Sequence, residues 1–280
     1  MVRSLFGGIA MPEFCERIAE DLGRLGVSPG ETILVHSSFK SLGPVPGGIG
    51  EVIRGLRGAV GERGTLLMPA LSWTLRPPDI FDPRRTPVNV GALPEFFRTM
   101  EGVFRSIHPT HSVCATGRRA LELLADHEKD HTPCGRHSPF RKLVETEGSI
   151  LMIGCGVRPN TTMHALEEYL EPPYLYGEDC LFTIRDHQGR VYRKEYRTHG
   201  FIAHGYSHRY DRIMDLDMHS CMRTGPILGA SAVRLDGPGL KRLVLEKLRE
   251  DPFFFVDPDP ADPGSEDPGA KEEPERRRDP

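Results

Sequence analysis

The chain has 280 residues and a mass of 31.3 kDa, with 38% apolar residues, 27% charged residues and a formal net charge of −4. A chain of this length can bury a sizeable core, as one large domain or as two small ones. It has no run of roughly 18 apolar residues that would span a membrane, and its amino-terminal apolar patch is too short for a signal peptide. These features exclude a membrane partner and predict a cytoplasmic protein.

The negative charge is concentrated in the last part of the chain. Residues 257–280 contain nine acidic and four basic side chains together with many prolines, a composition that predicts a disordered acidic tail. The preceding residues 1–256 contain 32 basic and 31 acidic side chains and are therefore close to neutral. A near-neutral body lacks the basic surface that binds nucleic acid, so we expect no nucleic-acid partner.

Helix and strand signals alternate in the first quarter of the chain. Apolar residues at helical spacing predict a helix between Pro12 and Gly26, and a buried strand follows at 32–36. A second helix is expected at 49–60 and a second strand at 64–71. A strand, a helix and a further strand in this order are typical of parallel sheet.

The later segments continue the α/β pattern and then change to an antiparallel one. Helices are expected at 94–100, 120–124, 138–147, 160–170 and 240–248, and strands at 103–107 and 149–154. Two strands at 181–185 and 191–196 flank a turn and predict an antiparallel hairpin. The expected fold is therefore a mixed, largely parallel central sheet flanked by helices, with a hairpin region in the C-terminal third, in one domain at 1–256.

The helix after strand 149–154 carries the clearest pair of reactive side chains. His164 and Glu167 are three residues apart and share a helix face that differs from its apolar face. A carboxylate one turn from an imidazole can fix its tautomer and stabilise its protonated form. Sheets of this class bind ligands just past the carboxyl ends of strands, where this helix begins. Spacing alone leaves two interpretations open, half of a general-base arrangement or an exposed pair without function.

Two further loops contain candidate polar residues. One contains His108 and His111, which can line a pocket or end strands. The other follows strand 32–36, and its hydroxyls, backbone N–H groups and ammonium could bind a phosphate. Its candidate residues are Ser37, Ser38, Lys40 and Gly43. The loop has neither the P-loop pattern nor the glycine pattern of dinucleotide-binding folds.

A third region, residues 199–221, is rich in potential metal ligands. It contains His199, His204, His208, Asp211, Asp215, Asp217, His219 and Cys221. Zinc sites use these residue types, so a metal-dependent hydrolase is an alternative function. Because no HExxH motif or paired CxxC motif organises these residues, we expect no metal.

Six segments together carry a resemblance to a known family. They are LVHSSFKSLGPVPGG at 34–48, GTLLMPAL at 64–71, VFRSIHPTHSVCATG at 103–117, TPCGRHSPFRKLVETEGSILMIGCG at 132–156, NTTMHALEEY at 160–169 and GPILGASAVRL at 225–235. In this order they resemble the aminoglycoside 3-N-acetyltransferase family, acetyl-CoA-dependent enzymes that acetylate antibiotics and confer resistance to them. The resemblance covers most of residues 12–256 and implies a fold distinct from that of the general N-acetyltransferase superfamily.

The resemblance also implies roles for individual residues. The histidine and glutamate of the NTxxHxxE pattern are associated with catalysis in that family, and they fall on His164 and Glu167. The residues that fall at or near the coenzyme A site are Ser37, Ser38, Lys40, Gly43, His108, His111, Ser112 and Ser138. The implied co-substrate is acetyl-CoA, and a non-catalytic coenzyme A-binding relative is a further alternative.

These residue types suit acyl transfer to a small-molecule amine. His164 would take a proton from the attacking amine, and Glu167 would orient the imidazole ring. Hydroxyl or N–H donors near Ser37 and Ser38, or in the segment 108–112, would stabilise the oxyanion.

The identity of the acceptor amine stays open at this stage. Carboxylates after residue 160 suit a polycationic aminoglycoside, and they are Glu167, Glu168, Glu171, Glu178 and Asp179. The histidine-rich and arginine-rich segment 198–221 instead favours a smaller and less charged amine. The sequence also leaves the oligomeric state open, and a homodimer is one expectation.

Overall fold

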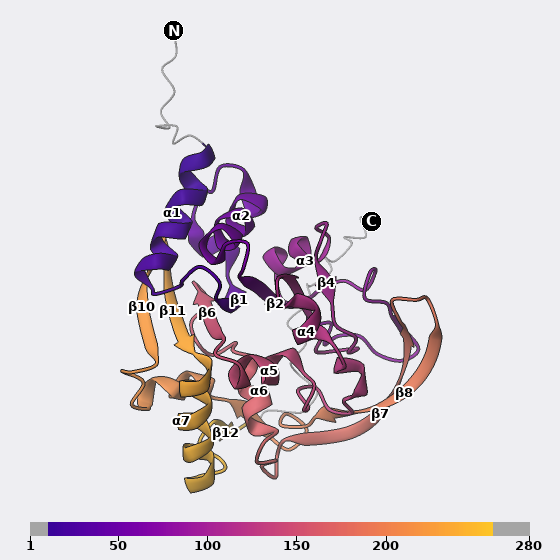
Figure 1. The fold of residues 1–280 in the computed structure, drawn as a ribbon. Helices are drawn as coiled ribbons and strands as arrows, with labels where there is room; N and C mark the ends of the chain where they lie inside the picture. The colour runs from indigo at the N-terminus through magenta and orange to yellow at the C-terminus, as the bar shows by residue number, and fades with distance from the viewer. Residues whose placement is uncertain (1–10, 260–280) are drawn as a thin grey trace, which may run out of the picture.

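A seven-stranded sheet lies at the centre of the computed structural model, which describes residues 11–259. Its strands are β1 (Thr32–Ser37), β2 (Thr65–Pro69), β4 (Phe104–Arg105), β5 (Val113–Gly117), β6 (Ser149–Ile153), β10 (Met222–Ile227) and β11 (Ala230–Asp236). They are ordered β10-β11-β6-β1-β2-β5-β4 across the sheet (Figure 1). The pairs β6-β1 and β1-β2 are parallel, and the strands on either side join them in antiparallel fashion. This arrangement confirms the predicted mixed sheet, whose parallel part is its centre.

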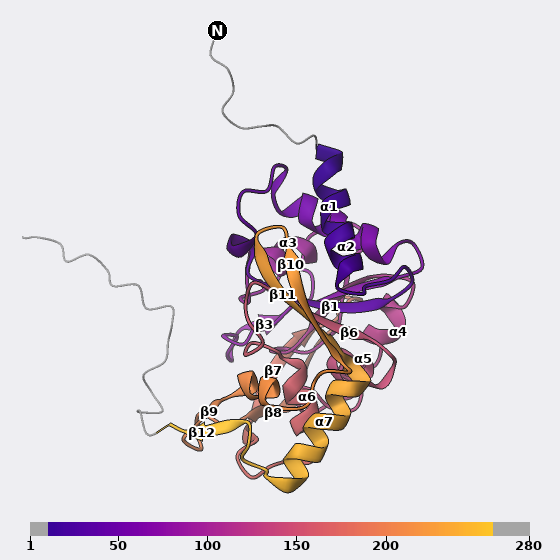
Figure 2. The same cartoon turned by 90° about the vertical axis from the view of Figure 1, so that its left-hand side faces the viewer.

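Helices cover both faces of the sheet, which explains why its central strands are apolar along their whole length. The helices on one face are α1 (Met11–Arg24), α2 (Gly48–Val60) and α3 (Ala92–Arg98); those on the other are α4 (Ala120–Leu124), α5 (Pro139–Glu145), α6 (Thr162–Glu167) and α7 (Gly237–Glu250). Along β1, Ile33 and Val35 pack against the first group, whereas Leu34 packs against the second. The two groups lie on opposite sides of the sheet in Figure 2.

A long antiparallel hairpin extends beyond the central sheet. It consists of β7 (Tyr176–Arg185) and β8 (Val191–His199), and β3 (Ile80–Phe81) pairs with β7 in parallel. The hairpin curves along one side of the molecule in Figure 1 and covers a small apolar cluster that includes Phe182 and Tyr196. The predicted hairpin is confirmed, and it is longer than expected because it includes polar residues at its open end.

Two short elements complete the region after the hairpin. The strand β9 (Tyr206–His208) pairs with β12 (Val256–Pro258), and a 3-10 helix, η3 (Tyr210–Asp215), follows β9. The first residues of the predicted tail at 257–280 therefore belong to a strand. The rest of that tail lies outside the described residues, and the single domain at 1–256 stays a prediction. Between residues 11 and 259, none of the helices combines the length and apolar character that crossing a membrane requires.

A tight turn after β6 brings two loops together at the carboxyl edge of the parallel strands. Gly154 has a φ of +64, and a Cβ there would lie 1.6 Å from the Ser41 hydroxyl. Only glycine fits this close approach and this backbone conformation. The backbone N–H of Ser38 donates to the Ile153 carbonyl at 2.8 Å. The loop after β1 and the segment leading into α6 are thus held side by side.

Candidate active site

His164 lies on α6 at the centre of a buried hydrogen-bond network. Its Nδ1 is 2.7 Å from the Tyr210 hydroxyl, and that hydroxyl is 2.6 Å from Glu167 Oε2. The direct separation between His164 Nδ1 and Glu167 Oε2 is longer, at 3.6 Å. Tyr174 donates a second hydrogen bond to Glu167 Oε1 at 3.0 Å. The predicted pairing of His164 with Glu167 is therefore mediated by Tyr210.

The network assigns a tautomer to the imidazole. Glu167 is completely buried, and as a carboxylate it can only accept hydrogen bonds. The single hydroxyl proton of Tyr210 therefore points to Glu167, which leaves the tyrosine oxygen to accept from His164. Nδ1 of His164 then carries the proton, and Nε2 has a free lone pair. A lone pair held in this way is what a general base requires.

Other histidine rings surround His164. His199, at the end of β8, lies 4.6 Å from it between ring centroids, and His208 of β9 lies 4.9 Å away. His111, from the loop before β5, is 5.9 Å away, and the Phe201 ring stacks on His164 at 5.6 Å. The loop before β5, the end of β8 and strand β9 therefore converge on the His164 imidazole.

Glu168, the residue after Glu167, forms a separate buried pair with His199. Its Oε1 is 3.0 Å from His199 Nε2, and both side chains are almost fully buried. Burial raises the pKa of Glu168 to about 7, although hydrogen bonds from the Thr132 hydroxyl and the Cys134 N–H oppose the rise. Burial and the nearby His164 hold the pKa of His199 well below its ordinary value. The pair fixes the orientation of the His199 ring.

A cavity of about 380 Å³ lies at the carboxyl ends of β1 and β2 and beside the start of α6. Its apolar walls include Leu71, Trp73 and Val90. Its lining also includes His36 and Ser37, whose Nε2 and Oγ atoms are buried without a hydrogen-bond partner. Buried polar atoms are normally paired, so these two atoms indicate a place where a ligand can bind.

The other predicted residues of the loop after β1 follow Ser37 in the chain and do not line this cavity. Ser38 precedes the 3-10 helix η1 (Phe39–Leu42), and its carbonyl accepts from the Ser41 hydroxyl at 2.6 Å. Lys40 and Gly43 are exposed. Of the four predicted residues, Ser37 lines the cavity and Lys40 presents its ammonium group to solvent.

The loop before β5 holds three of the predicted residues, and they differ in surroundings. His108 Nδ1 accepts from the backbone N–H of His111 at 2.9 Å, so it shapes the turn that carries His111. The hydroxyl of Ser112 donates to the Ala70 carbonyl and accepts from Arg105, both within the interior. Only His111 of these three faces His164.

Ser138 begins helix α5 as predicted, with Pro139 in the first turn. Its side chain makes no capping hydrogen bond, and its buried hydroxyl has no hydrogen-bond partner. It does not line the cavity beside Ser37.

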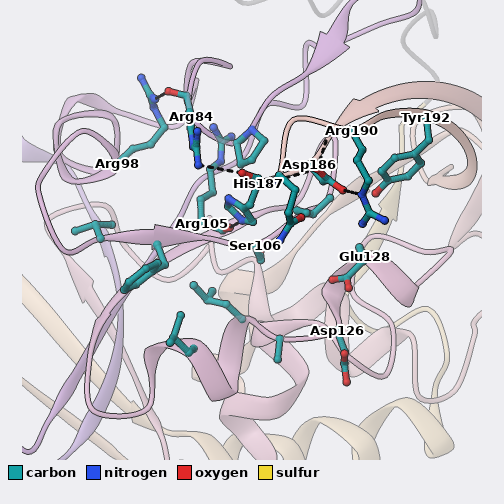
Figure 3. Close-up of a pocket in the computed structure, with 18 of the residues that line it drawn as sticks. Arg84, Arg98, Arg105, Ser106, Asp126, Glu128, Asp186, His187, Arg190 and Tyr192 are labelled. Atoms are coloured by element: carbon teal, nitrogen blue, oxygen red, sulfur yellow. Dashed lines mark hydrogen bonds and ion pairs between the residues drawn. The ribbon is translucent and has the colours of Figure 1, made fainter.

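Two further cavities lie away from the loop after β1. One, of about 270 Å³, contains the carboxylates of Glu171, Asp179 and Glu195, and it shares Thr132 with the Glu168 pair. The other, of about 1160 Å³, contains Arg84 and Arg98 on one side and Asp126 and Glu128 on the other (Figure 3). None of the predicted site residues lines the larger cavity.

The histidine-rich region 199–221 does not form a metal cluster of its own among the described residues. His199 and His208 instead approach His164, and each belongs to a group of potential ligands that includes it. The exposed His204 contacts the Tyr176 carbonyl, and His219 is exposed elsewhere. The region 199–221 therefore contributes His199 and His208 to the surroundings of His164. The spacing of residues along the sequence did not indicate this contact.

Two tyrosines of the network were not predicted as site residues. Tyr210 lies in the region 198–221, 43 residues from Glu167 along the chain, and Tyr174 lies just after α6. A tyrosine near a histidine-rich segment was the only sequence signal for Tyr210. Its partnership with Glu167 depends on the fold.

Sequence comparisons reveal related proteins over most of the chain. A family model described as aminoglycoside 3-N-acetyltransferase matches residues 34–248. Aminoglycoside N(3)-acetyltransferase IV from Salmonella sp is 32% identical over 249 residues, which cover 86% of this chain and 91% of that protein. Aminoglycoside N(3)-acetyltransferase VII from Streptomyces paromomycinus is 37% identical over 177 residues, which cover 56% of this chain and 61% of that protein.

Solved structures share the fold. Aminoglycoside acetyltransferase AAC(3)-IVa, in complex with gentamicin, is 30% identical with a TM-score of 0.74, and the match covers 87% of this chain and 91% of that one. AAC-IIIb, in a binary complex with CoASH, is 27% identical with a TM-score of 0.75, and the match covers 88% of this chain and 98% of that one.

The buried histidines predict a loss of stability in mild acid. Burial is the largest cause of a lowered pKa at six of them, which are His36, His108, His111, His127, His199 and His208. Such a group takes up a proton only on unfolding, so its stabilising contribution is complete above about pH 6.5 and is lost as pH falls below that value. Glu168, with its raised pKa of about 7, acts in the opposite direction but is one group against six.

The free energy of unfolding, measured by urea denaturation, should therefore fall between pH 6.5 and pH 5. Each histidine can contribute up to about 1.4 kcal/mol per pH unit. A free energy of unfolding that is constant or rises over this range would contradict the assignment of neutral buried histidines.

Proposed function

Because the chain belongs to the aminoglycoside 3-N-acetyltransferase family, we propose that His164, Tyr210 and Glu167 form the centre of its acetyl transfer. The protein is an acetyl-CoA-dependent N-acetyltransferase. The observation that carries the proposed centre is the hydrogen-bonded chain from His164 Nδ1 through the Tyr210 hydroxyl to Glu167. The family favours this activity over a metal-dependent hydrolase or a non-catalytic coenzyme A-binding protein.

In the proposed mechanism, His164 acts as the general base. The lone pair on Nε2 takes a proton from the acceptor amine as the amine nitrogen attacks the thioester carbonyl. The new C–N bond forms, the C–S bond breaks, and the thiolate of coenzyme A leaves. The imidazolium formed on His164 is stabilised by Glu167 through the Tyr210 hydroxyl, because that hydroxyl accepts from Nδ1 and donates to the carboxylate.

We assign the acetyl-CoA arm to the cavity beside Ser37. The unpaired Ser37 hydroxyl and His36 Nε2 offer hydrogen bonds within a mostly apolar space, as a thioester arm requires. The phosphate groups of coenzyme A are assigned to the residues that follow in the loop, Ser38, Lys40 and Gly43. The exposed ammonium of Lys40 suits a phosphate group. In this assignment His111 borders the reacting thioester, whereas His108, Ser112 and Ser138 support the surrounding segments.

The proposed acceptor is an aminoglycoside. A solved relative is a complex with gentamicin, and the cavity that contains Glu171 and Glu195 offers carboxylates that suit a polycation; its third carboxylate, Asp179, pairs with Arg197. The arginines of the region 198–221 do not oppose this assignment, because Asp211 and Asp257 pair with Arg209, and Asp257 also pairs with Arg212. A homodimer and a cytoplasmic location stay predictions.

Replacing His164 by Ala or Glu167 by Gln should lower turnover by about 10²- to 10⁴-fold, because each change removes or misorients the base. The measurement is thiol release from acetyl-CoA with a panel of aminoglycosides and small amines. The affinity for coenzyme A should change little, since neither residue lines the cavity beside Ser37.

Two controls accompany these variants. His219→Ala removes an exposed histidine and should behave like the unmodified protein. Thermal unfolding of each variant separates lost chemistry from lost folding. Near-normal turnover in both His164→Ala and Glu167→Gln would refute the proposed centre, and no coenzyme A binding by the unmodified chain would refute the proposed function.

Replacing Tyr210 by Phe tests whether the bridging hydroxyl matters. Removing a hydrogen bond to a charged group should lower kcat by about ten- to a hundredfold while the KM for acetyl-CoA is unchanged. Tyr174→Phe is a matched control, because Tyr174 also donates to Glu167 but makes no hydrogen bond to His164. Equal losses of kcat in the two variants would indicate that Tyr210 only supports the buried carboxylate.

A further inference from the structure

Three histidines from separate segments bring their ring nitrogens together in the site. Potential ligand atoms of His111, His164 and His199 all lie within 4.8 Å of one another. The rings come from the loop before β5, from α6 and from the end of β8. Neighbouring centroids are 4.6 Å apart for His164 and His199, and 5.3 Å apart for His111 and His199.

Each of these rings has one nitrogen already bonded to the protein. His164 Nδ1 is held by Tyr210, His199 Nε2 by Glu168, and His111 Nδ1 by Thr110 Oγ1 at 2.9 Å. The three other nitrogens are therefore left for a ligand. The one on His199, Nδ1, is buried and has no hydrogen-bond partner, and the His199 side chain is only 4% exposed. A buried nitrogen without a partner requires an explanation.

We propose that His111, His164 and His199 form a binding site for a zinc-like divalent transition-metal ion, and that the bound ion inhibits acetyl transfer. The site matches the donor set of open zinc centres, which have three imidazole ligands and a free fourth position. It also has the outer hydrogen bonds typical of such centres, with Glu168 behind His199 and Tyr210 behind His164. The inhibitory effect, unlike the binding, rests on the proposed function.

The spacing of the potential ligand atoms also suits a metal ion. Tetrahedral zinc places its ligand nitrogens about 3.4 Å apart, so rings already within 4.8 Å need to move by only about an ångström.

A second group of ligands is less suitable. His164, Glu167 and His208 also lie close together. Both oxygens of Glu167 already accept from tyrosine hydroxyls, and a metal ion there would displace Tyr210 from its place between His164 and Glu167. The first group leaves these hydrogen bonds intact.

Binding at the first group would occupy the atom that the reaction needs. In the proposed mechanism, the lone pair on His164 Nε2 takes the proton of the amine. A metal ion coordinated by that lone pair prevents the proton transfer. Inhibition should be reversed when a chelator removes the ion.

The direct test is a Co²⁺ titration of the full chain without a purification tag, followed by visible absorption, with Zn²⁺ competition. One ion per chain is expected, with the absorption of a tetrahedral centre. His199→Asn should weaken binding at least about a hundredfold, and Glu168→Gln by about ten- to a hundredfold. His204→Asn, an exposed histidine of the same region, is the matched control and should bind as the unmodified chain does.

The outcomes separate the site from the function. Absence of Co²⁺ binding, or equal binding by His199→Asn and the unmodified chain, would overturn the site. This titration uses no substrate, so its result on metal binding is valid even if the chain fails to transfer acetyl groups. The inhibitory effect is tested in the thiol-release assay. It is supported when Zn²⁺ inhibits turnover, a chelator reverses this inhibition, and His199→Asn weakens it. Unchanged or increased turnover with Zn²⁺ bound would overturn it.

Discussion

Glu167 is a carboxylate with no exposed surface, and the arrangement of the site depends on how the structure satisfies it. Two tyrosine hydroxyls donate to its two oxygens. Because a hydroxyl has one proton, the Tyr210 oxygen is left to accept a hydrogen bond, and His164 Nδ1 supplies it. A buried acceptor thus determines the tautomer of a partly exposed imidazole. The reactive nitrogen is the one that the network leaves free.

The fold provides this arrangement by bringing distant segments to one edge of the sheet. The parallel strands β6, β1 and β2 end on the same side, and the Gly154 turn directs the chain from β6 towards α6 beside the loop after β1. The hairpin then places His199 against α6, and the short strand pair β9-β12 holds His208 and Tyr210 next to it. The cavity beside Ser37 includes Thr161, which precedes α6, and His164 lies on that helix where the hairpin packs against it.

Local patterns in the sequence predicted the elements that are long and apolar. The strands at 32–36 and 149–154, the flanking helices and the hairpin were all expected. Strands β10 and β11 were missed, whereas the edge strand β4 lies within the expected strand at 103–107. β10 contains Gly225 and Pro226, residues that interrupt a strand pattern and that its edge position tolerates. Strand β5 was missed because its short VCATG sequence follows a loop dominated by histidine and serine.

The pair His164 and Glu167 was found from helical spacing and from resemblance, yet its bridging partner was not. Tyr210 and Glu167 are 43 residues apart in the chain, and helical or strand periodicity does not predict a contact over that separation. The same holds for His199 and His208, which were grouped with their sequence neighbours although the fold turns them towards His164. Long-range packing, which local sequence does not encode in a readable way, decides these partnerships.

The central claim is that the buried carboxylate, acting through Tyr210, holds His164 as the tautomer with the proton on Nδ1. Nitrogen NMR of the protein labelled with ¹⁵N histidine measures this directly, with the His164 signal assigned by its loss in His164→Ala. The account predicts a protonated Nδ1 and an unprotonated Nε2 at neutral pH. A His164 signal with the proton on Nε2 would contradict it, because the free lone pair would then face Tyr210 instead of the substrate.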